Sequence, residues 1–355
     1  MSSTPACKVT GNIFAATATD TDLDTDPDTS TKKVLVVDCG TGECKALLFQ
    51  RFPDGTINVA EMRIFAPVLS FINEGRSADL VNLVVALAKD AQEGHHGSCP
   101  RIALGLSAWF RDLLADTSPR GAATKDIVEQ VLAQIASQLM ESDLTMVPIM
   151  LSDLDEAKFE AIAVSYAATH SGLPPTDVVV GSGGGSIQFS YRDPEGNTLS
   201  YSIPIGFRRG IELMKKNIRA CDQWDNICHD TIAKFMAMHG LTPNGGNCVG
   251  ISACFYGWKL VCIGDVKKAV SAADVKKAFK DKQAELRAML TDEEAMADED
   301  LKKQTIKDLS NATIQRHLFS VLLADEAQVN FGRDWVVNGQ KFRTTWSTGW
   351  SMDNC

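Results

Sequence analysis

The sequence predicts an α/β protein of two similar domains that face one another across a central cleft. Two Val-rich runs, VLVV at 34–37 and DVVV at 177–180, are typical of strands buried on both faces. Each run is followed by a glycine-rich loop and then by a hairpin. The two loops begin at Asp38 and at Gly181, and internal repetition on the scale of a whole domain indicates two similar domains.

The first unit opens the folded part of the chain at Lys33. Its strand leads into the loop 38–42, with the sequence DCGTG, and a second strand is predicted over 45–49. The turn at 53–55, Pro-Asp-Gly, then returns the chain into a third strand over 56–65. This order of strand, glycine loop and hairpin is the unit that recurs.

The second unit repeats the order. After the strand at 177–180 comes the loop 181–185, with the sequence GSGGG, and then a strand over 186–191. A turn at 194–197 leads into a returning strand over 198–205. The two turns are separated by nearly the same stretch of chain as the two loops. Two unrelated hairpins are therefore the poorer interpretation.

The repeat divides the chain into an acidic tail over 1–31, a first domain over 32–150 and a second domain over 151–330. The tail is polar and cannot bury enough surface to offset its ordering entropy, so we expect it to be disordered. Residues 331–355 are expected to pack back on the first domain. A charged segment over about 265–316 predicts surface helices inserted at the periphery of the second domain.

Two helices are predicted between the repeated units. Residues 124–142 place their apolar side chains on one stripe, as an amphipathic helix does. A strand over 146–151 is followed by a helix over 152–168. Ser152 and Asp155 are three positions apart at its start, which is the spacing of a capping box.

Composition excludes several classes of function. The 355 residues carry a formal net charge of −10, which argues against a general nucleic-acid or membrane-surface binder, because such proteins need a basic face. No signal peptide and no transmembrane run are visible, so we predict a cytoplasmic protein without a membrane segment. The ten cysteines form no C-x-x-C pair and are expected to be free thiols.

The glycine loops suggest phosphate binding, because main-chain N–H groups in a tight loop form an anion cradle. The dinucleotide fingerprint G-x-G-x-x-G fails, since Lys45 and Ser186 stand where its third glycine belongs. The chain contains neither G-x-x-x-x-G-K-[ST] nor G-x-S-x-G, which excludes a P-loop enzyme and the usual serine-hydrolase elbow. A pair of phosphate-binding hairpins, one in each domain, remains.

Five short motifs follow one another along the chain. They are DCGTGECK at 38–45, SAWFRDL at 107–113, LSDLDEAKF at 151–159, GSGGGSIQ at 181–188 and WSTG at 346–349. In this order they resemble the motifs of the apyrase or nucleoside-diphosphohydrolase family, with the exopolyphosphatases as near relatives. These families share the actin-like (ribonuclease H-like) fold with actin, heat-shock chaperones and sugar kinases. The resemblance implies that duplicated two-domain fold, with a central nucleotide cleft.

The resemblance also implies a reaction, the removal of terminal phosphate from nucleoside tri- or diphosphates with a divalent cation, Mg²⁺ or Ca²⁺. It makes Glu156 the general base and places Asp38 at the cation and its waters. Arg111 would offset charge on the transferred phosphate, and Gln188 would orient the attacking water. The residues that it implies for phosphate binding are Gly40, Thr41, Gly42, Lys45, Ser107, Gly183, Gly184, Gly185 and Ser186.

Without the resemblance, these residues have simpler explanations. A glutamate such as Glu156 is favoured at a helix start by the helix dipole. Asp38 can cap the turn after its strand, and Arg111 can be a surface residue near a helix start. Ser186 and Gln188 suit the polar face of an alternating strand.

One position departs from the family's motifs. The fourth motif resembles one that opens with aspartate, and this chain has Gly181 there. In a duplicated fold that aspartate would be the partner of Asp38 in handling metal and water. Asp177 lies about 13 Å upstream along a strand and cannot simply replace it. We therefore expect weak hydrolysis at best, retained nucleotide binding, and a gain in activity or metal affinity from Gly181→Asp.

Two other functions stay open. A catalytically weakened sensor or scaffold protein could use the same cleft to bind nucleotides. An exopolyphosphatase would want a basic channel, of which the net charge of −10 gives no hint. Arg208 and Arg209 after the second hairpin either face phosphate or solvate a helix start. Tyr256 and Trp346 either stack on a base or fill the core.

Overall fold

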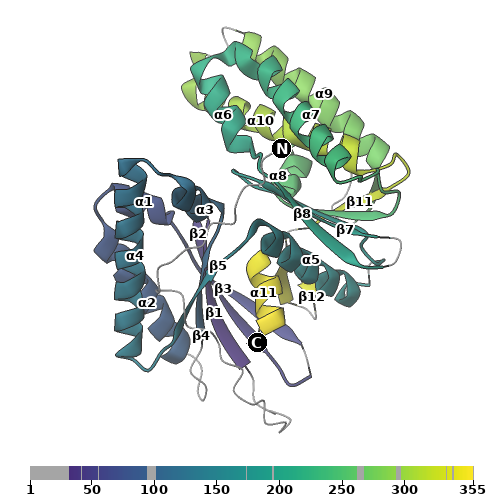
Figure 1. Ribbon diagram of the computed structural model, residues 1–355. Helices are drawn as coiled ribbons and strands as arrows, with labels where there is room; N and C mark the ends of the chain where they lie inside the picture. Colours follow the sequence, from purple (N-terminus) through teal and green to yellow (C-terminus); the bar gives the residue numbers. More distant parts are fainter. Residues whose placement is uncertain are drawn as a thin grey trace.

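The structure is a computed structural model of the chain, shown in Figure 1. It describes residues 32–40, 42–54, 56–93, 101–172, 174–193, 196–261, 268–292, 297–332, 334–337 and 340–354. The predicted acidic tail over 1–31 and the predicted phosphate ligand Thr41 lie outside the described residues.

The first sheet is built from the first repeated unit and two later strands. Its order is β3-β2-β1-β4-β5, in which β1, β2 and β3 are antiparallel and β4 and β5 run parallel to β1. The strands are β1 (Lys32–Cys39), β2 (Cys44–Arg51), β3 (Ile57–Phe65), β4 (Arg101–Leu106) and β5 (Met146–Met150).

The second sheet repeats this topology. Its order is β10-β11-β9-β6-β7-β8, so that β8-β7-β6-β9-β11 matches the first sheet strand for strand, with the short β10 added at one edge. The strands are β6 (Val178–Ser182), β7 (Ile187–Arg192), β8 (Thr198–Ile203), β9 (Asn247–Ser252), β10 (Val270–Ser271) and β11 (Gln328–Phe331). The predicted internal duplication is confirmed.

Helices cover both sheets. Those of the first half are α1 (Val68–Asn73), α2 (Ser77–Glu93), α3 (Ala108–Ala115), α4 (Pro119–Met140) and α5 (Asp153–His170). Those of the second half are α6 (Phe207–Lys216), α7 (Cys221–Met238), α8 (Ala253–Val261), α9 (Ala272–Thr291), α10 (Glu299–Leu322) and α11 (Trp346–Asn354). A short 3₁₀ turn, Ile218–Ala220, precedes α7, and a small hairpin of β12 (Asp334–Val337) and β13 (Gln340–Arg343) precedes α11.

The elements form two lobes with shared layers between them. In Figure 1, α1 to α4 lie on the outer side of the first sheet, and α6, α7, α9 and α10 lie on the outer side of the second. Helices α5 and α11 lie between the sheets. Along β1 the side chains alternate: Leu35 and Val37 join the core under α1 to α4, whereas Val34 and Val36 join the core with α5 and α11. This period of two explains the continuous apolar run.

The prediction of surface helices over 265–316 is wrong for α10. Half of its 24 residues are buried, and it packs against α6, α7, α8 and α9. Several buried side chains are polar and find partners inside: Ser310 Oγ donates to Phe207 O at 2.6 Å, and Gln315 Nε2 donates to Ser182 Oγ at 2.7 Å. A polar sequence therefore forms the centre of the second lobe, because buried polar groups are stable when they are hydrogen-bonded.

The C-terminal segment packs on both α5 and the first sheet. Gly349 lies so close to α5 that a Cβ there would collide with the carbonyl of Phe159. Trp346 is 3% exposed and covers Gly105 of β4, where a Cβ would collide with the indole ring. Trp346 is therefore a core residue. The WSTG motif forms the first turn of α11 and packs this helix against β4 and α5.

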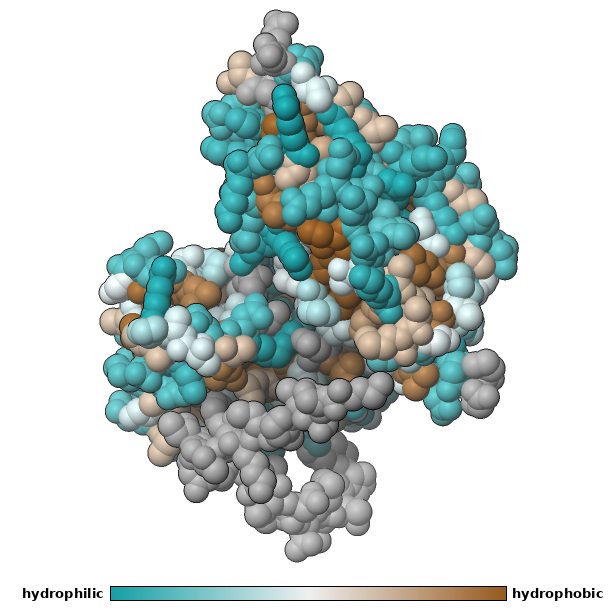
Figure 2. Space-filling view, turned by 45° about the horizontal axis from the view of Figure 1, so that its top comes forward, coloured by the Kyte–Doolittle hydropathy of each residue, from teal (hydrophilic) through white to brown (hydrophobic). Residues whose placement is uncertain are grey.

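The described part of the chain shows no disulfide among its cysteines Cys39, Cys44, Cys221, Cys228, Cys248 and Cys254, which are free. Its helices include none that is both long enough and apolar enough to cross a lipid bilayer. In the space-filling view, hydrophilic side chains cover most of the upper lobe (Figure 2).

A charged network holds the helices of the second lobe together around Asp225. Its carboxylate accepts hydrogen bonds from His317 at 2.8 Å and Gln283 at 2.8 Å, and lies near Arg316 and Arg287. Burial alone would raise the pKa of Asp225, but these hydrogen bonds and charges outweigh it and hold the pKa well below its ordinary value. The ionised carboxylate therefore stabilises the folded state above about pH 4, and this contribution is lost as the pH falls.

We expect Asp225→Asn to lower the free energy of unfolding at pH 7 by about 2 kcal/mol, because the variant loses hydrogen bonds to a charged group. The difference from wild type should shrink as the pH is lowered toward 3. Denaturant unfolding at several pH values measures both effects. Asp222→Asn is the matched control, since Asp222 pairs with Arg287 but its side chain is 78% exposed. Equal losses in the two variants would contradict a buried role for Asp225.

Candidate active site

The two glycine loops share one backbone hydrogen bond at equivalent positions. Gly40 N donates to Glu43 O at 3.1 Å in the first loop, and Gly183 N donates to Ser186 O at 2.8 Å in the second. Donor and acceptor stand at equivalent positions of the two repeated units. The sequence repeat is therefore a repeat of backbone structure down to single hydrogen bonds.

Both loops line one cleft between the lobes, with a volume of about 700 Å³. Gly42 and Lys45 line it from the first loop and strand, and Gly183 and Gly184 from the second loop. The rest of the lining comes mainly from α6, α8 and α10. The cationic side chains on its walls are Lys45, Arg208, Lys259 and Lys307, and the acidic ones are Glu43 and Asp308. The cleft is thus more basic than the chain as a whole.

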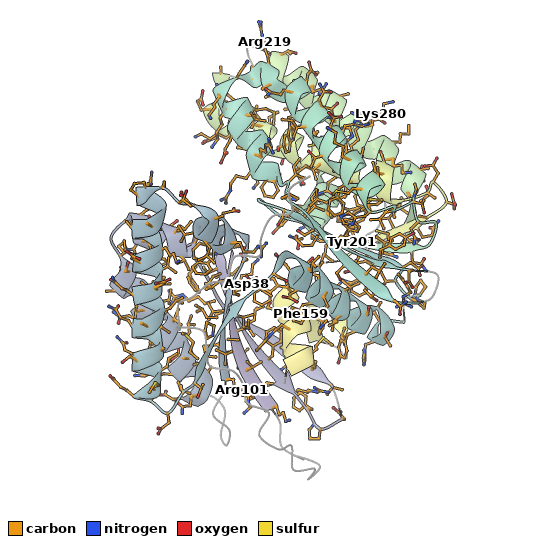
Figure 3. All side chains as sticks on the ribbon, in the orientation of Figure 1. Asp38, Arg101, Phe159, Tyr201, Arg219 and Lys280 are labelled. Carbon is orange, nitrogen blue, oxygen red and sulfur yellow. The ribbon has the colours of Figure 1, made fainter. Side chains whose placement is uncertain are left out.

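Asp38 lies near the end of β1, at the side of the first sheet that faces the second lobe (Figure 3). It is opposite Lys45 across the hairpin, and Trp346 hydrogen-bonds to its carboxylate. Burial raises the pKa of Asp38, while the charge of Lys45 and the bond from Trp346 act in the opposite direction. A carboxylate here is a hard oxygen donor of the kind that Mg²⁺ and Ca²⁺ prefer.

Ser107 and Trp109 support the first loop. The Ser107 hydroxyl donates to Cys39 O at 3.1 Å, and Trp109 Nε1 donates to the same carbonyl at 2.6 Å. Ser107 is 7% exposed and is the N-terminal cap residue of α3. In this structure its hydroxyl orients the loop backbone, whereas the sequence resemblance implies a direct contact with phosphate.

Arg111 and Glu156 form an ion pair between α3 and α5. Arg111 Nη2 lies 3.6 Å from Glu156 Oε2, and Arg111 Nη1 donates to Leu151 O at 2.7 Å. The side chains are 20% and 16% exposed. Glu156 stands in the first turn of α5, which is capped by Ser152 accepting from Asp155 N at 3.1 Å. The guanidinium and the predicted base are thus brought together, as the resemblance implies.

The second loop is held by its own hairpin and by α6. Gln188 Nε2 donates to Ser186 Oγ at 2.6 Å, and both side chains are buried. Gly206 precedes α6, and a Cβ there would collide with the backbone of Gly184 and Gly185. This close approach fixes the loop against the start of α6.

Of the predicted site residues in the described part of the chain, Gly42, Lys45, Gly183 and Gly184 line the cleft. The others are not part of its lining: Asp38, Gly40, Ser107, Arg111, Glu156, Gly185, Ser186 and Gln188. A second hollow of about 720 Å³, between α5 and β8, contains none of them. The cleft therefore brings together predicted phosphate-binding residues from both loops, and the predicted catalytic residues are not on its surface.

Glu160 is the residue that sequence reasoning missed. It follows Glu156 by one helical turn on α5, is 6% exposed, and reaches Gly181 on β6. A Cβ on Gly181 would collide with Glu160 Oε2 and lie 3.1 Å from its Cδ. Burial and the charges of Glu156 and Asp38 raise the pKa of Glu160 well above its ordinary value, partly offset by a hydrogen bond from Ser252. The signal in the sequence was Gly181, because a glycine there leaves a space that the side chain of Glu160 fills.

This arrangement changes the expectation for Gly181→Asp. An aspartate at 181 would have to displace the Glu160 carboxylate, so the single substitution is not expected to raise metal affinity or activity. The φ of Gly181 lies outside the left-handed region, so the conformation of the backbone is no obstacle. Ser252 does adopt φ +56°, a conformation that costs a non-glycine residue about 1–2 kcal/mol.

The donors fit a divalent cation that is bound together with phosphate. Within the described ranges, no three His, Cys, Asp or Glu side chains form a ready-made metal cluster. Mg²⁺ is commonly held by only one or two carboxylates plus substrate phosphates. The charge of Asp38 contributes to the raised pKa of Glu160, and a cation bound at these carboxyl groups would favour their ionised forms.

No model of a known protein family matches the sequence, and no curated protein matches it. Solved structures do match its fold. An Aquifex aeolicus PPX-GPPA enzyme is 14% identical, with 92% of this chain and 100% of that chain covered and a TM-score of 0.56. An exopolyphosphatase from Cytophaga hutchinsonii is 12% identical, with 91% and 98% covered and a TM-score of 0.54.

The chain has the duplicated actin-like fold. A structure of an Aquifex aeolicus member of the Ppx/GppA family agrees, at 15% identity, with 91% and 97% covered and a TM-score of 0.57. At these identities the similarity shows the actin-like fold alone. The more specific resemblance to apyrases stays a prediction.

The close contact at Gly206 tests the actin-like cleft. We expect Gly206→Ala to lower the free energy of unfolding by about 1–3 kcal/mol, because the new methyl group meets backbone atoms of the second loop. Gly42→Ala is the matched control: nothing lies within 4 Å of its Cβ. Urea unfolding compares the two, and equal stability would show that the second loop moves aside without cost.

Proposed function

We propose that the protein is a phosphohydrolase that uses a divalent cation to remove terminal phosphate from phosphoanhydride chains. The observation that carries this proposal is the meeting of two equivalent glycine loops at one cleft, beside the Arg111–Glu156 ion pair. Glycine loops bind phosphate through main-chain N–H groups. A carboxylate next to such a site can accept the proton of an attacking water.

Each residue then has a role that its surroundings support. Glu156 accepts the proton from water, and Arg111 keeps its carboxylate oriented while offsetting charge on the transferred phosphate. The Gln188 amide, fixed by Ser186, orients the water. Ser107 and Trp109 hold the first loop in its binding shape. None of these side chains lines the cleft, so on this proposal the terminal phosphate enters between the loops to reach them.

The cation belongs on the carboxylate side of the cleft. Asp38 is its predicted ligand, directly or through water, and Lys45 is placed to contact phosphate oxygens. A bound divalent cation would neutralise charge on the phosphate oxygens. Mg²⁺ and Ca²⁺ both suit oxygen donors, and the site does not favour one by its ligands.

Inorganic polyphosphate is the substrate that the cleft favours. Lys45, Arg208, Lys259 and Lys307 come from four different elements, and all four line the same cleft. A linear polyanion needs such repeated cations, whereas a single terminal phosphate does not. The solved structures with this fold described as exopolyphosphatases support the same choice.

A nucleoside di- or triphosphate is the second candidate. Tyr256 of α8 lines the same cleft and is 49% exposed. An accessible aromatic ring at this place can stack on a base, which polyphosphate lacks. A binding protein without turnover remains the alternative of another class.

Phosphate release decides among these functions. We expect the full-length protein to release phosphate from long-chain polyphosphate faster than from ATP or ADP, with Mg²⁺ or Ca²⁺ added, and to stop with EDTA. Glu156→Gln should reduce turnover by about 10²–10⁴-fold and leave substrate affinity nearly unchanged, because only the proton acceptor is lost.

Asp155→Asn is the control for Glu156→Gln, since it removes an exposed carboxylate from the same turn of α5. It should keep wild-type turnover. Nucleotide or polyphosphate binding without any phosphate release would identify a sensor or scaffold protein. Release that is unaffected by Glu156→Gln would reduce this glutamate to a charge at a helix start.

The basic residues of the outer cleft make a separate prediction. Replacing both Lys259 and Lys307 with Gln should raise KM for long polyphosphate about tenfold and leave KM for tripolyphosphate nearly unchanged, because short chains do not reach α8 and α10. Lys280→Gln is the control, on the outer side of α9 far from the cleft (Figure 3). Equal effects on long and short chains would contradict an extended binding path.

A further inference from the structure

The second sheet lacks a carboxylate where the first sheet has Asp38. Asp38 pairs with Lys45 across the first hairpin, and Gly181 pairs with Gln188 across the second. The two pairs stand at equivalent positions of the repeated units. A cation held between the two lobes would therefore have an acidic ligand from the first sheet and none from the second.

Glu160 brings a carboxylate to the vacant position from another element. The collision of a Gly181 Cβ with Glu160 Oε2 means that the glutamate occupies the space where a side chain at 181 would begin. The carboxylate reaches this place from α5, which is packed between the two sheets. The Glu160 carboxylate can therefore occupy this space only because residue 181 is a glycine.

Ser252 connects Glu160 to the cleft. The Ser252 hydroxyl donates to the Glu160 carboxylate, and Ser252 itself lines the cleft. Ser252 also ends β9 in the left-handed conformation, which turns the chain beside Ser182 in the sheet. Non-glycine residues in this conformation persist where the surroundings hold them, often at functional sites.

We propose that Glu160 replaces the carboxylate missing at Gly181 and holds the divalent cation from the second-sheet side, opposite Asp38. Asp38 stands at the position of the first hairpin that corresponds to Gly181 of the second, and the Glu160 carboxylate lies against Gly181. The charge of Asp38 also acts on Glu160. Carboxylate oxygens are the donors that Mg²⁺, Mn²⁺ and Ca²⁺ take. The role of this ion in turnover rests on the proposed function, whereas its binding does not.

The test moves the carboxylate from one element to the other. Mn²⁺ binding to the full-length protein, without substrate, is measured by electron paramagnetic resonance for wild type, Glu160→Gln, Glu160→Ala, Gly181→Asp and the double variant Glu160→Ala with Gly181→Asp. Asp155→Asn is the control for loss of one negative charge on α5. Circular dichroism checks folding, and phosphate release from polyphosphate is measured in parallel.

We expect Glu160→Gln and Glu160→Ala to weaken Mn²⁺ binding about 10–100-fold, as loss of a supporting carboxylate does. Gly181→Asp alone should bind no more tightly than wild type, because its side chain competes with Glu160 for one space. The double variant should bind within about threefold of wild type, since aspartate at 181 restores one carboxylate at the same place. Asp155→Asn should match wild type.

Wild-type affinity in Glu160→Gln would overturn the proposal, as would a folded double variant that binds no better than Glu160→Ala. Absence of Mn²⁺ binding by the wild type would overturn it too. If the double variant does not fold, the isosteric Glu160→Gln decides alone. Recovery of Mn²⁺ binding without phosphate release by any variant, wild type included, would support Glu160 and reject the proposed function. Phosphate release and Mn²⁺ affinity that are both unaffected by Glu160→Gln would reject the role of Glu160 and support the proposed function.

Discussion

The packing of α5 between the two sheets is the constraint on which the site depends. Phe159 joins the core on the first sheet, while Val164 joins the core on the second. Because Gly349 has no side chain, α11 approaches α5 so closely that a Cβ at 349 would collide with the backbone of Phe159. A helix confined in this way has little freedom to rotate or slide. Glu156 and Glu160, four positions apart, lie on one face of it and are therefore fixed relative to both lobes.

The duplication preserved the backbone more closely than the side chains. Both loops keep the same N–H to carbonyl bond, but the first hairpin carries Asp38 and Lys45 where the second carries Gly181 and Gln188. Backbone geometry follows from strand pairing and glycine conformation, which both halves must satisfy in order to fold. Charge at the cleft is under no such requirement. One half can therefore be neutral while an element outside the repeat, α5, brings the charge.

Local patterns were enough to predict the strands of the two repeated units, because runs such as Val34 to Val37 are continuously apolar. The strands β4, β9, β10 and β11 were not predicted. Local patterns were also insufficient for α10. Ser310 and Gln315 are buried through partners 103 and 133 residues away, and no local pattern records such pairs. The five motifs contain the residues that were predicted for the candidate site, but Glu160 is not among them. Its place depends on the space above Gly181, which exists only in the folded chain.

The net charge of −10 does not describe the cleft, whose lining carries four basic side chains and two acidic ones. The carboxyl groups of Asp38, Glu156 and Glu160 are not part of that lining, and the charges of Asp38 and Glu156 both act on Glu160. On the proposed function, these acidic groups repel a terminal phosphate unless a divalent cation lies between them. Binding of cation and of phosphoanhydride then favour one another, and linkage makes the effect equal in both directions. On that proposal, the basic side chains of the cleft attract the anion, and the reacting phosphate is held only when the metal is present.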